Sequence, residues 1–126
     1  MKQTTVLIAA ALLFLGTAGA QTARSEKIRA DDAKRLLETN KATVLADVRT
    51  QEEYDAGRIP GAILLPFDQI TAASAAKALP DKNAPVIVYC RTGRRSAVAA
   101  KTLTDLGYRT VYDMGGINQW KGKLER

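Results

Sequence analysis

The stretch Pro85-Val86-Ile87-Val88-Tyr89-Cys90-Arg91-Thr92-Gly93-Arg94-Arg95-Ser96 carries most of the information in this chain of 126 residues. Its first five residues are apolar, which is typical of a strand that is buried on both faces of a parallel sheet. The only cysteine of the sequence follows, and then a glycine and three arginines within five residues. Ligands of open parallel sheets bind beyond the carboxyl ends of the strands, so the pattern predicts a binding loop that begins at Cys90.

The segments around this stretch alternate between strand and helix patterns. Residues 21–25 form a polar stretch. Strands are predicted at 43–48, 62–65, 85–89 and 109–113. Helices are predicted at 31–38, from the capping box Thr50-Gln51-Glu52-Glu53 to Gly57, from Pro66 to Leu79, at 94–106, and after Gly115-Gly116. Asp31 is expected to cap the start of the first helix, and Gly107 the end of the helix at 94–106. The alternation predicts a single α/β domain, with a mostly parallel central sheet of about five strands flanked by helices on both faces.

The first twenty residues have the layout of a secretory signal peptide. Lys2 precedes an apolar run from Val6 to Leu15, and Ala18-Gly19-Ala20 predicts cleavage before Gln21. A membrane anchor is the less favoured alternative, because the run is shorter than the roughly 18 residues that span a bilayer. We therefore expect a signal peptide at 1–20, one domain at 21–126, a periplasmic or secreted location, and no stable membrane anchor after cleavage.

Residue counts narrow the chemistry further. An unpaired cysteine in an exported chain is a candidate reactive thiol. The sequence has no histidine, which excludes Cys-His and Ser-His-Asp catalysis and makes a zinc site improbable. We expect no metal and no cofactor.

The net charge of +6 favours the binding of small anions. The sequence has no basic stripe with interleaved aromatic residues, so nothing in it indicates binding to nucleic acid. We expect a monomer.

The loop from Cys90 to Ser96 is suited to holding an anion. Backbone N–H groups in a tight strand-to-helix loop converge on a concavity, and Gly93 lets the backbone turn. These N–H groups, the arginines and the positive end of the following helix are together expected to lower the pKa of the Cys90 thiol. Because a lower pKa also weakens a thiolate as a nucleophile, the net gain in rate is a few-fold. We therefore expect the loop to contribute more by binding an anionic substrate than by making the Cys90 thiolate more reactive. The alternative is that Cys90 is an inert core residue, which the arginines disfavour.

Four motifs in order resemble the rhodanese family of sulfurtransferases, and the resemblance covers nearly all of residues 21–126. They are Asp47-Val48-Arg49 with Glu52, Glu53 and Tyr54; Gly57-Arg58-Ile59-Pro60-Gly61-Ala62; Val88 to Ser96; and Gly115-Gly116-Ile117 with Trp120. The length and the N-terminal pattern resemble the small single-domain periplasmic type. Arg58 is a departure, because the family often has histidine at that position.

The resemblance implies a reaction and a set of site residues. Cys90 is expected to take the outer sulfur of thiosulfate or a similar small anion as a persulfide, and to pass it to cyanide or a thiol. Arg91 and Arg95 are expected to bind the donor, and the substrate-binding loop also includes Thr92, Gly93, Arg94 and Ser96. Asp47 and Arg49 are expected to support the site, with an ion pair between Arg49 and Glu53.

Two other functions stay open at this point. The related Cdc25-like phosphatases have a loop one residue longer, with arginine six positions after cysteine, where this chain has Ser96. A phosphatase or arsenate reductase is therefore less favoured. A thiol-sensing or binding module of the cell envelope on the same fold is the non-enzymatic alternative, and the intact loop favours an enzyme over it.

Overall fold

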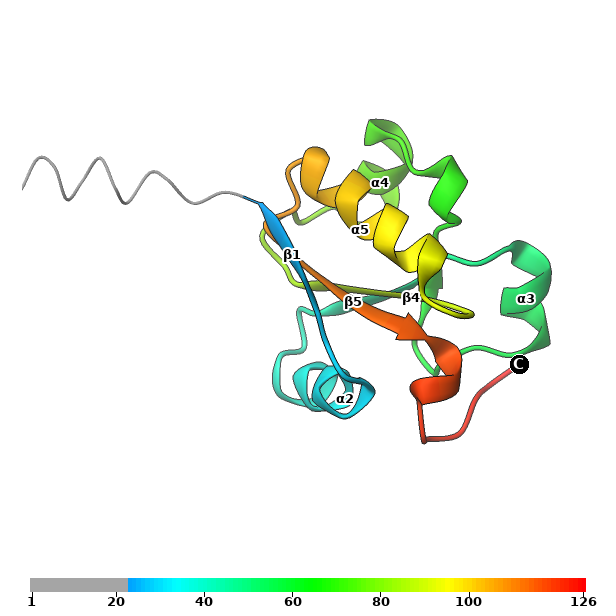
Figure 1. The fold of residues 1–126 in the computed structure, drawn as a ribbon. Helices are drawn as coiled ribbons and strands as arrows, with labels where there is room; N and C mark the ends of the chain where they lie inside the picture. The colour runs from blue at the N-terminus through cyan, green and yellow to red at the C-terminus, as the bar shows by residue number, and fades with distance from the viewer. Residues whose placement is uncertain (1–22) are drawn as a thin grey trace, which may run out of the picture.

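Five parallel strands form the central sheet of the structure, a computed structural model that describes residues 23–126 (Figure 1). The elements are β1 (Arg24–Lys27), α2 (Ala30–Thr39), β2 (Val44–Asp47), α3 (Gln51–Ala56), β3 (Ile63–Leu64), the 3-10 helix η1 (Phe67–Gln69), α4 (Ala72–Ala78), β4 (Val86–Cys90), α5 (Arg94–Asp105), β5 (Thr110–Gly116) and the 3-10 helix η2 (Ile117–Gln119). The strand order is β1-β5-β4-β2-β3, with every pair parallel. The predicted α/β domain is confirmed.

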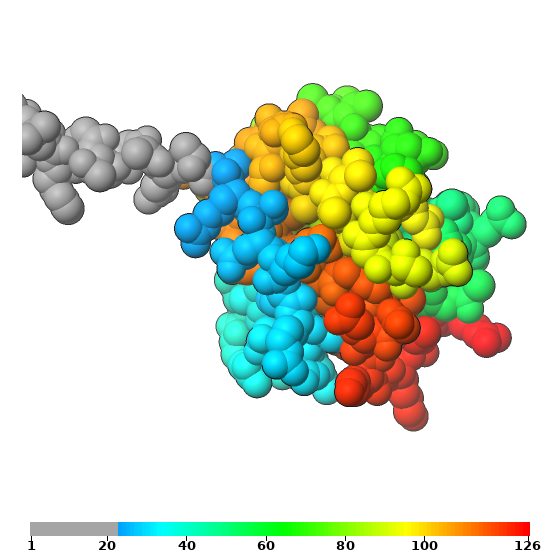
Figure 2. Space-filling model, viewed as in Figure 1, coloured from blue at the N-terminus to red at the C-terminus, as the bar shows by residue number. Residues whose placement is uncertain are grey.

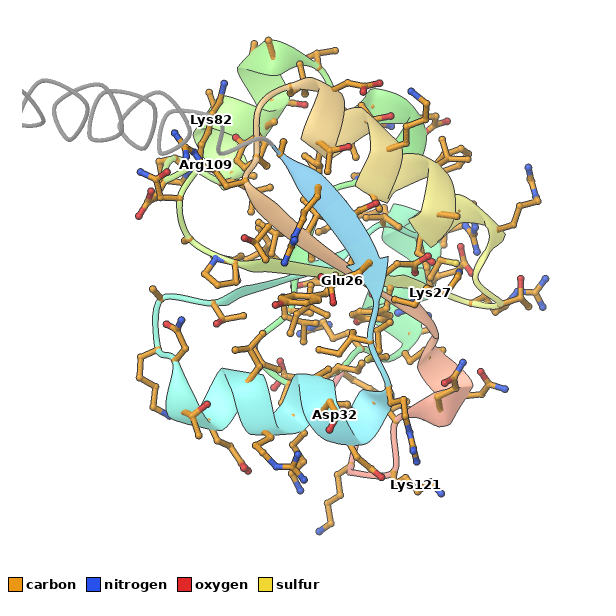
Figure 3. The ribbon with its side chains drawn as sticks, turned by 60° about the vertical axis from the view of Figure 1, so that its left-hand side comes forward. Glu26, Lys27, Asp32, Lys82, Arg109 and Lys121 are labelled. Carbon is orange, nitrogen blue, oxygen red and sulfur yellow. The ribbon has the colours of Figure 1, made fainter. Side chains whose placement is uncertain are left out.

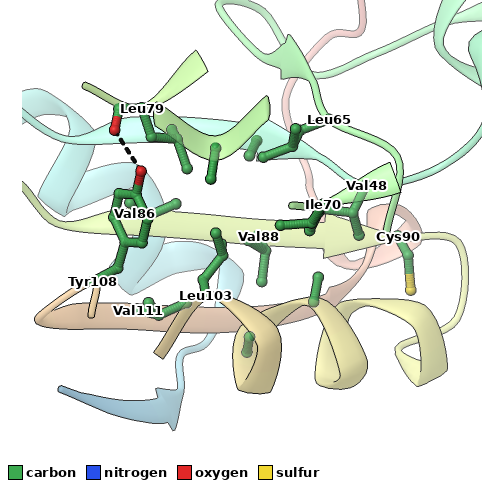
Figure 4. Close-up of a cluster of buried hydrophobic side chains, with 14 residues drawn as sticks. Val48, Leu65, Ile70, Leu79, Val86, Val88, Cys90, Leu103, Tyr108 and Val111 are labelled. Carbon is green, nitrogen blue, oxygen red and sulfur yellow. Dashed lines mark hydrogen bonds between the residues drawn. The ribbon is translucent and has the colours of Figure 1, made fainter. Parts of the chain in front are cut away.

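Strand β4 lies at the centre of the sheet and is buried along its whole length, as its apolar sequence predicts. Val86, Val88 and Cys90 belong to a hydrophobic cluster that also contains residues of α4 and α5 (Figure 4). Ile87 and Tyr89 alternate with them and belong to a second cluster, which contains residues of α2. Helices therefore cover both faces of the sheet, as expected, and Cys90 ends the row that faces α5.

A glycine cap ends α5 and connects it to the core. The Tyr108 N–H donates to the Leu103 carbonyl at 3.1 Å, and the Gly107 N–H donates to the Thr104 carbonyl at 3.0 Å. Gly107 has a φ of 98°, so the end is a Schellman motif and the predicted cap is confirmed. The Tyr108 hydroxyl also donates to the Leu79 carbonyl at 2.7 Å, which links the end of α5 to the end of α4 (Figure 4).

The start of the domain differs from the sequence-based expectation. Part of the stretch that looked merely polar belongs to β1, whose four side chains are all exposed. Backbone pairing with β5 holds this edge strand in the sheet. Its side chains need no apolar pattern, since none of them enters the core. Asp31 does not cap α2; it lies in the first turn, and Arg29 occupies the N-cap position. The predicted signal peptide at 1–20 lies outside the described residues.

Strand β5 also runs further than expected. It continues through Gly115 and Gly116 instead of ending at Asp113, because these glycines pair with Tyr89 and Cys90 of β4. Of the helices between residues 23 and 126, none combines the length and the apolar character needed to span a membrane.

The expected ion pair between Arg49 and Glu53 is wrong, because Arg49 pairs with Asp47. The Arg49 Nη2 lies 2.6 Å from the Asp47 Oδ2, and both residues are buried. The Tyr89 hydroxyl donates to the same carboxylate at 2.7 Å and accepts from the Ile59 N–H at 3.1 Å. A buried carboxylate needs such partners. Asp47 and Arg49 therefore join β2, β4 and the turn at Ile59 underneath the loop.

Replacing Arg49 with methionine should destabilise the fold by about 3–5 kcal/mol, because Asp47 would stay buried without its counter-charge. The double variant Asp47→Asn/Arg49→Met should recover part of this loss, since an amide oxygen still accepts from Tyr89. Urea unfolding followed by circular dichroism measures both. A loss below about 1 kcal/mol for Arg49→Met, the range of an exposed ion pair, would contradict the structural role.

Candidate active site

Cys90 is the last residue of β4, and the backbone of the following loop folds around its sulfur. The Gly93 N–H lies 2.9 Å from the Cys90 Sγ and the Ser96 N–H lies 3.3 Å from it. Cys90 is fully buried. Two amide donors aimed at one sulfur form the anion-binding concavity that the sequence predicts.

The loop has this shape because Gly93 adopts a left-handed conformation, with a φ of 115° at the N-cap position of α5. A residue with a Cβ rarely adopts such a backbone. The turn directs the first N–H groups of the segment toward the sulfur. The buried Ser96 hydroxyl donates to the Gly93 carbonyl at 3.0 Å, which closes the loop from within.

The pKa of the Cys90 thiol is lowered, as expected, although burial acts to raise it. Hydrogen bonds from the Ser96 hydroxyl and from the N–H groups of Ser96, Gly93 and Thr92 outweigh the burial. Because the Ser96 hydroxyl has one proton, at a given moment it donates a hydrogen bond either to the sulfur or to the Gly93 carbonyl. Hydrogen bonds to the thiolate therefore matter more here than the arginine charges that the sequence emphasised.

Two glycines at the end of β5 form one wall of the loop. A Cβ on Gly116 would lie 2.6 Å from the Arg91 carbonyl oxygen, and a Cβ on Gly93 would lie 3.7 Å from the Gly115 Cα. At Gly116 the loop and the end of β5 can approach this closely only because a side chain is missing, whereas a Cβ on Gly93 would make an ordinary contact. Gly115 and Gly116 therefore lie directly beside the loop.

The three arginines of the loop have different surroundings. Arg95 makes a two-fold ion pair with Glu53, with distances of 2.7 Å and 2.9 Å between the paired nitrogens and oxygens. Glu53 also completes the predicted capping box with Thr50 at the start of α3. Arg91 and Arg94 are exposed, and within residues 23–126 neither makes an ion pair. Arg91 and Arg94 are therefore the free cations of the loop, and donor binding by Arg91 and Arg95 stays a prediction.

The ion pair with Arg95 sets the charge of Glu53. The hydrogen bonds from Arg95 lower the pKa of Glu53 to about 2; burial opposes this shift and hydrogen bonds from Thr50 add to it. The same contact raises the pKa of Arg95. Sequence reasoning missed this pairing, although β2 and β4 are neighbours and the capping box places Glu53 just beyond β2. Since β2 and β4 are parallel neighbours, residues that follow them, such as Glu53 and Arg95, lie at the same edge of the sheet.

A pocket of about 340 Å³ adjoins the loop, and sequence reasoning missed it too. Thr92 and Gly93 line it together with residues from the ends of β1 and β5. Since β1 has no apolar pattern, nothing in the sequence indicated that Lys27 and Arg29 lie beside the loop. Among the described residues, cysteine and acidic side chains do not gather in groups of three or more that could hold a metal ion.

Comparisons with known proteins bear on this site. A family model described as "Rhodanese-like domain" matches residues 29–123. The thiosulfate sulfurtransferase PspE of Escherichia coli is 41% identical over 71 residues, which cover 56% of this chain and 67% of that protein. A putative mitochondrial thiosulfate sulfurtransferase of Schizosaccharomyces pombe is 34% identical, over 68% of each chain. The chain spans only 22% of a third relative, the adenylyltransferase and sulfurtransferase UBA4 of Meyerozyma guilliermondii.

A solved structure shares the fold over almost its whole length. It is described as a "rhodanese with anions from E. coli" and superimposes with a TM-score of 0.62 at 34% identity. The match covers 67% of this chain and 98% of that one.

The Ser96→Ala variant should have a higher Cys90 pKa than the natural protein, because the thiolate loses a hydroxyl donor. The thiolate absorbance in the ultraviolet, followed against pH, measures this directly, since the sequence has one cysteine. The control Ser25→Ala removes an exposed hydroxyl of β1 and should not move the midpoint. Equal midpoints for Ser96→Ala and the natural protein would contradict the role of Ser96.

The Glu53→Gln variant should be less stable than the natural protein by about 1–3 kcal/mol at pH 7. The lowered pKa of Glu53 means that its carboxylate stabilises the fold fully above about pH 4.5. This contribution declines below that pH and is lost as the pH falls through about 2. Glutamine keeps one oxygen for the capping box but loses the charge and one of the two oxygens that accept from Arg95, so the comparison measures the ion pair.

Unfolding by urea between pH 7 and pH 2 tests this. The difference between Glu53→Gln and the natural protein should shrink as the pH falls below 4.5 and vanish near 2. A difference that does not change with pH would show that the ion pair with Arg95 does not stabilise the fold.

Proposed function

This chain belongs to the rhodanese-like family of sulfurtransferases, and we propose that it moves a sulfane sulfur from thiosulfate, or a similar donor, to cyanide or a thiol through a persulfide on Cys90. The observation that carries the proposal is the convergence of the Gly93 and Ser96 N–H groups on the Cys90 sulfur. These donors stabilise negative charge on sulfur without a general base, which suits a chain that has no histidine.

In the first step the Cys90 thiolate attacks the outer sulfur of thiosulfate. A sulfur–sulfur bond to Cys90 forms, the bond within thiosulfate breaks, and sulfite leaves with the electron pair. Cys90 then carries a persulfide anion, and the loop amides face the added charge. The exposed Arg91 and Arg94 supply positive charge for the dianionic donor.

In the second step the acceptor attacks the outer sulfur of the persulfide. The bond between the two sulfurs breaks and Cys90 leaves as a thiolate, which again accepts from Gly93 and Ser96. Cyanide gives thiocyanate, and a thiolate gives a hydropersulfide. Because the enzyme alternates between two stable forms, the kinetics should be ping-pong.

The surrounding acids argue against the phosphatase alternative. Hydrolysis of a phosphate ester needs an acid that protonates the leaving alcohol, with a pKa near the working pH. Glu53 has a pKa of about 2 and is bound to Arg95. Asp47 is buried and bound to Arg49. Sulfur transfer needs no such acid, because sulfite and Cys90 leave as anions.

The matched pair of the natural protein and Cys90→Ser tests the proposal. After incubation with thiosulfate, the natural protein should gain the mass of one sulfur atom and Cys90→Ser should gain nothing. With cyanide added, only the natural protein should produce thiocyanate, with parallel lines in double-reciprocal plots. An unchanged mass of the natural protein, or equal thiocyanate from both proteins, would refute a persulfide on Cys90.

A further inference from the structure

The ion pair between Arg95 and Glu53 lies at the rim of the active-site loop. Arg95 is the second residue of α5 and directly precedes Ser96, whose N–H lies 3.3 Å from the Cys90 Sγ. Glu53 is in the first turn of α3. In Figure 2 the yellow start of α5 lies beside the green α3 at the surface of the molecule. The two charges thus meet beside the entrance to the sulfur.

Glu53 occupies the two terminal nitrogens of the Arg95 guanidinium. The Nη1 and Nη2 of Arg95 lie 2.7 Å and 2.9 Å from the two carboxylate oxygens of Glu53. Arginine binds carboxylates and phosphate-like anions alike through such paired N–H groups. The side chains of Arg95 and Glu53 are 18% and 25% exposed, so dissolved anions can reach the pair. An oxyanion in the loop must therefore compete with Glu53 for these nitrogens.

The charge of Arg95 also acts on the sulfur. The hydrogen bonds with Glu53 are the main reason that the pKa of Arg95 is raised; burial opposes this shift, and the charge of the Cys90 thiolate adds to it. The guanidinium is thus within electrostatic reach of the sulfur. When the outer sulfur of thiosulfate contacts Cys90, the oxygens of the same molecule come within the reach of Arg95. Without Glu53, Arg95 would be placed to bind them.

A second fixed cation beside the loop is balanced in the same way. Lys27, at the carboxyl end of β1 (Figure 3), lies 3.4 Å from Asp113, and both residues line the pocket that adjoins the loop. Arg91 and Arg94 differ, because they are exposed and make no ion pair within residues 23–126. On the side of α3 and on the side of β1, an acid therefore reduces the attraction that the loop exerts on anions.

A limited attraction for oxygens suits a site that acts on a sulfur atom. Thiosulfate and sulfate are both dianions with three oxygens on one face, and they differ in the fourth atom. Sulfite, the product of the first step, presents the same three oxygens. A strong contact with these oxygens would hold donor, product and sulfate alike, and uniform binding of this kind does not speed the reaction. Selection then rests on the outer sulfur of the donor.

We propose that Glu53 is a positioning residue that keeps Arg95 from binding the oxygens of sulfate-like anions, so that sulfate and sulfite occupy the loop only weakly. The inference rests on the proposed function and specifies how the same site treats competing anions.

Sulfate is the probe for this inference, because it has no outer sulfur to transfer. In Glu53→Gln the released guanidinium should gain hydrogen bonds to sulfate, and the inhibition constant of sulfate against thiosulfate should fall about tenfold. The KM for thiosulfate should fall as well, with no rise in kcat. A merely structural role of Glu53 predicts the opposite, a higher KM from a loosened loop. The matched control Glu52→Gln makes the same change at the exposed neighbouring position and should alter neither constant.

The double variant Glu53→Gln/Arg95→Gln tests whether Glu53 acts through Arg95. It removes both charges together, so both constants should return to near their natural values. Constants that stay low would show that Glu53 acts without Arg95. Strongly raised constants would show that Arg95 already binds anions in the natural protein, and this result decides even if Glu53→Gln alone does not fold. Either result, or unchanged constants in Glu53→Gln, would overturn the inference, while thiocyanate formation would still support the proposed function.

Titration with sulfate, followed by NMR at the Gly93 and Ser96 amides, needs no turnover. These two N–H groups face the Cys90 sulfur, so their chemical shifts report an anion in the loop. The sulfate concentration at half of the shift change should be about tenfold lower in Glu53→Gln than in the natural protein. Equal midpoints, or no shift in either protein, would overturn the inference even if sulfur transfer itself fails.

Discussion

The site depends on the hydrogen bonds that the loop backbone donates to the Cys90 sulfur. A buried thiolate without donors would be strongly disfavoured, and burial does act to raise the pKa of this thiol. The Ser96 hydroxyl and the N–H groups of Ser96, Gly93 and Thr92, which donate to the sulfur, reverse that effect. They point at the sulfur because Gly93 takes a left-handed turn between a buried strand and the helix α5. The rest of the domain keeps this turn in place.

Three contacts hold the loop from different sides. The ion pair between Glu53 and Arg95 fastens it to α3. Gly116, without a side chain, lets the end of β5 pack against the Arg91 carbonyl. Below it, Asp47 fixes the neighbouring strand through Arg49 and Tyr89. Arg95 therefore has a structural role through its ion pair with Glu53, whereas Arg91 and Arg94 are exposed and make no ion pair within residues 23–126.

Much of this could be predicted from sequence, because the strongest patterns are local. The apolar run of β4, the glycine at 93, the capping box at Thr50 and the cap at Gly107 each report a nearby backbone requirement. Side-chain ion pairs left no such pattern. Arg49 has acids two and four residues away, and only the fold decides that Asp47 is its partner. The exposed β1 has no hydrophobic signal, so the pocket beside it was not predictable either.

We propose that Cys90 becomes a persulfide that the loop amides hold. Thiosulfate whose outer sulfur is a heavy isotope tests it most directly, with mass spectrometry of the peptide that contains Cys90. If Cys90 carries the sulfur, this peptide should gain one heavy sulfur, and cyanide should then remove it as heavy thiocyanate. Heavy sulfur that stays in thiosulfate, or a Cys90 peptide of unchanged mass, would contradict a persulfide on Cys90.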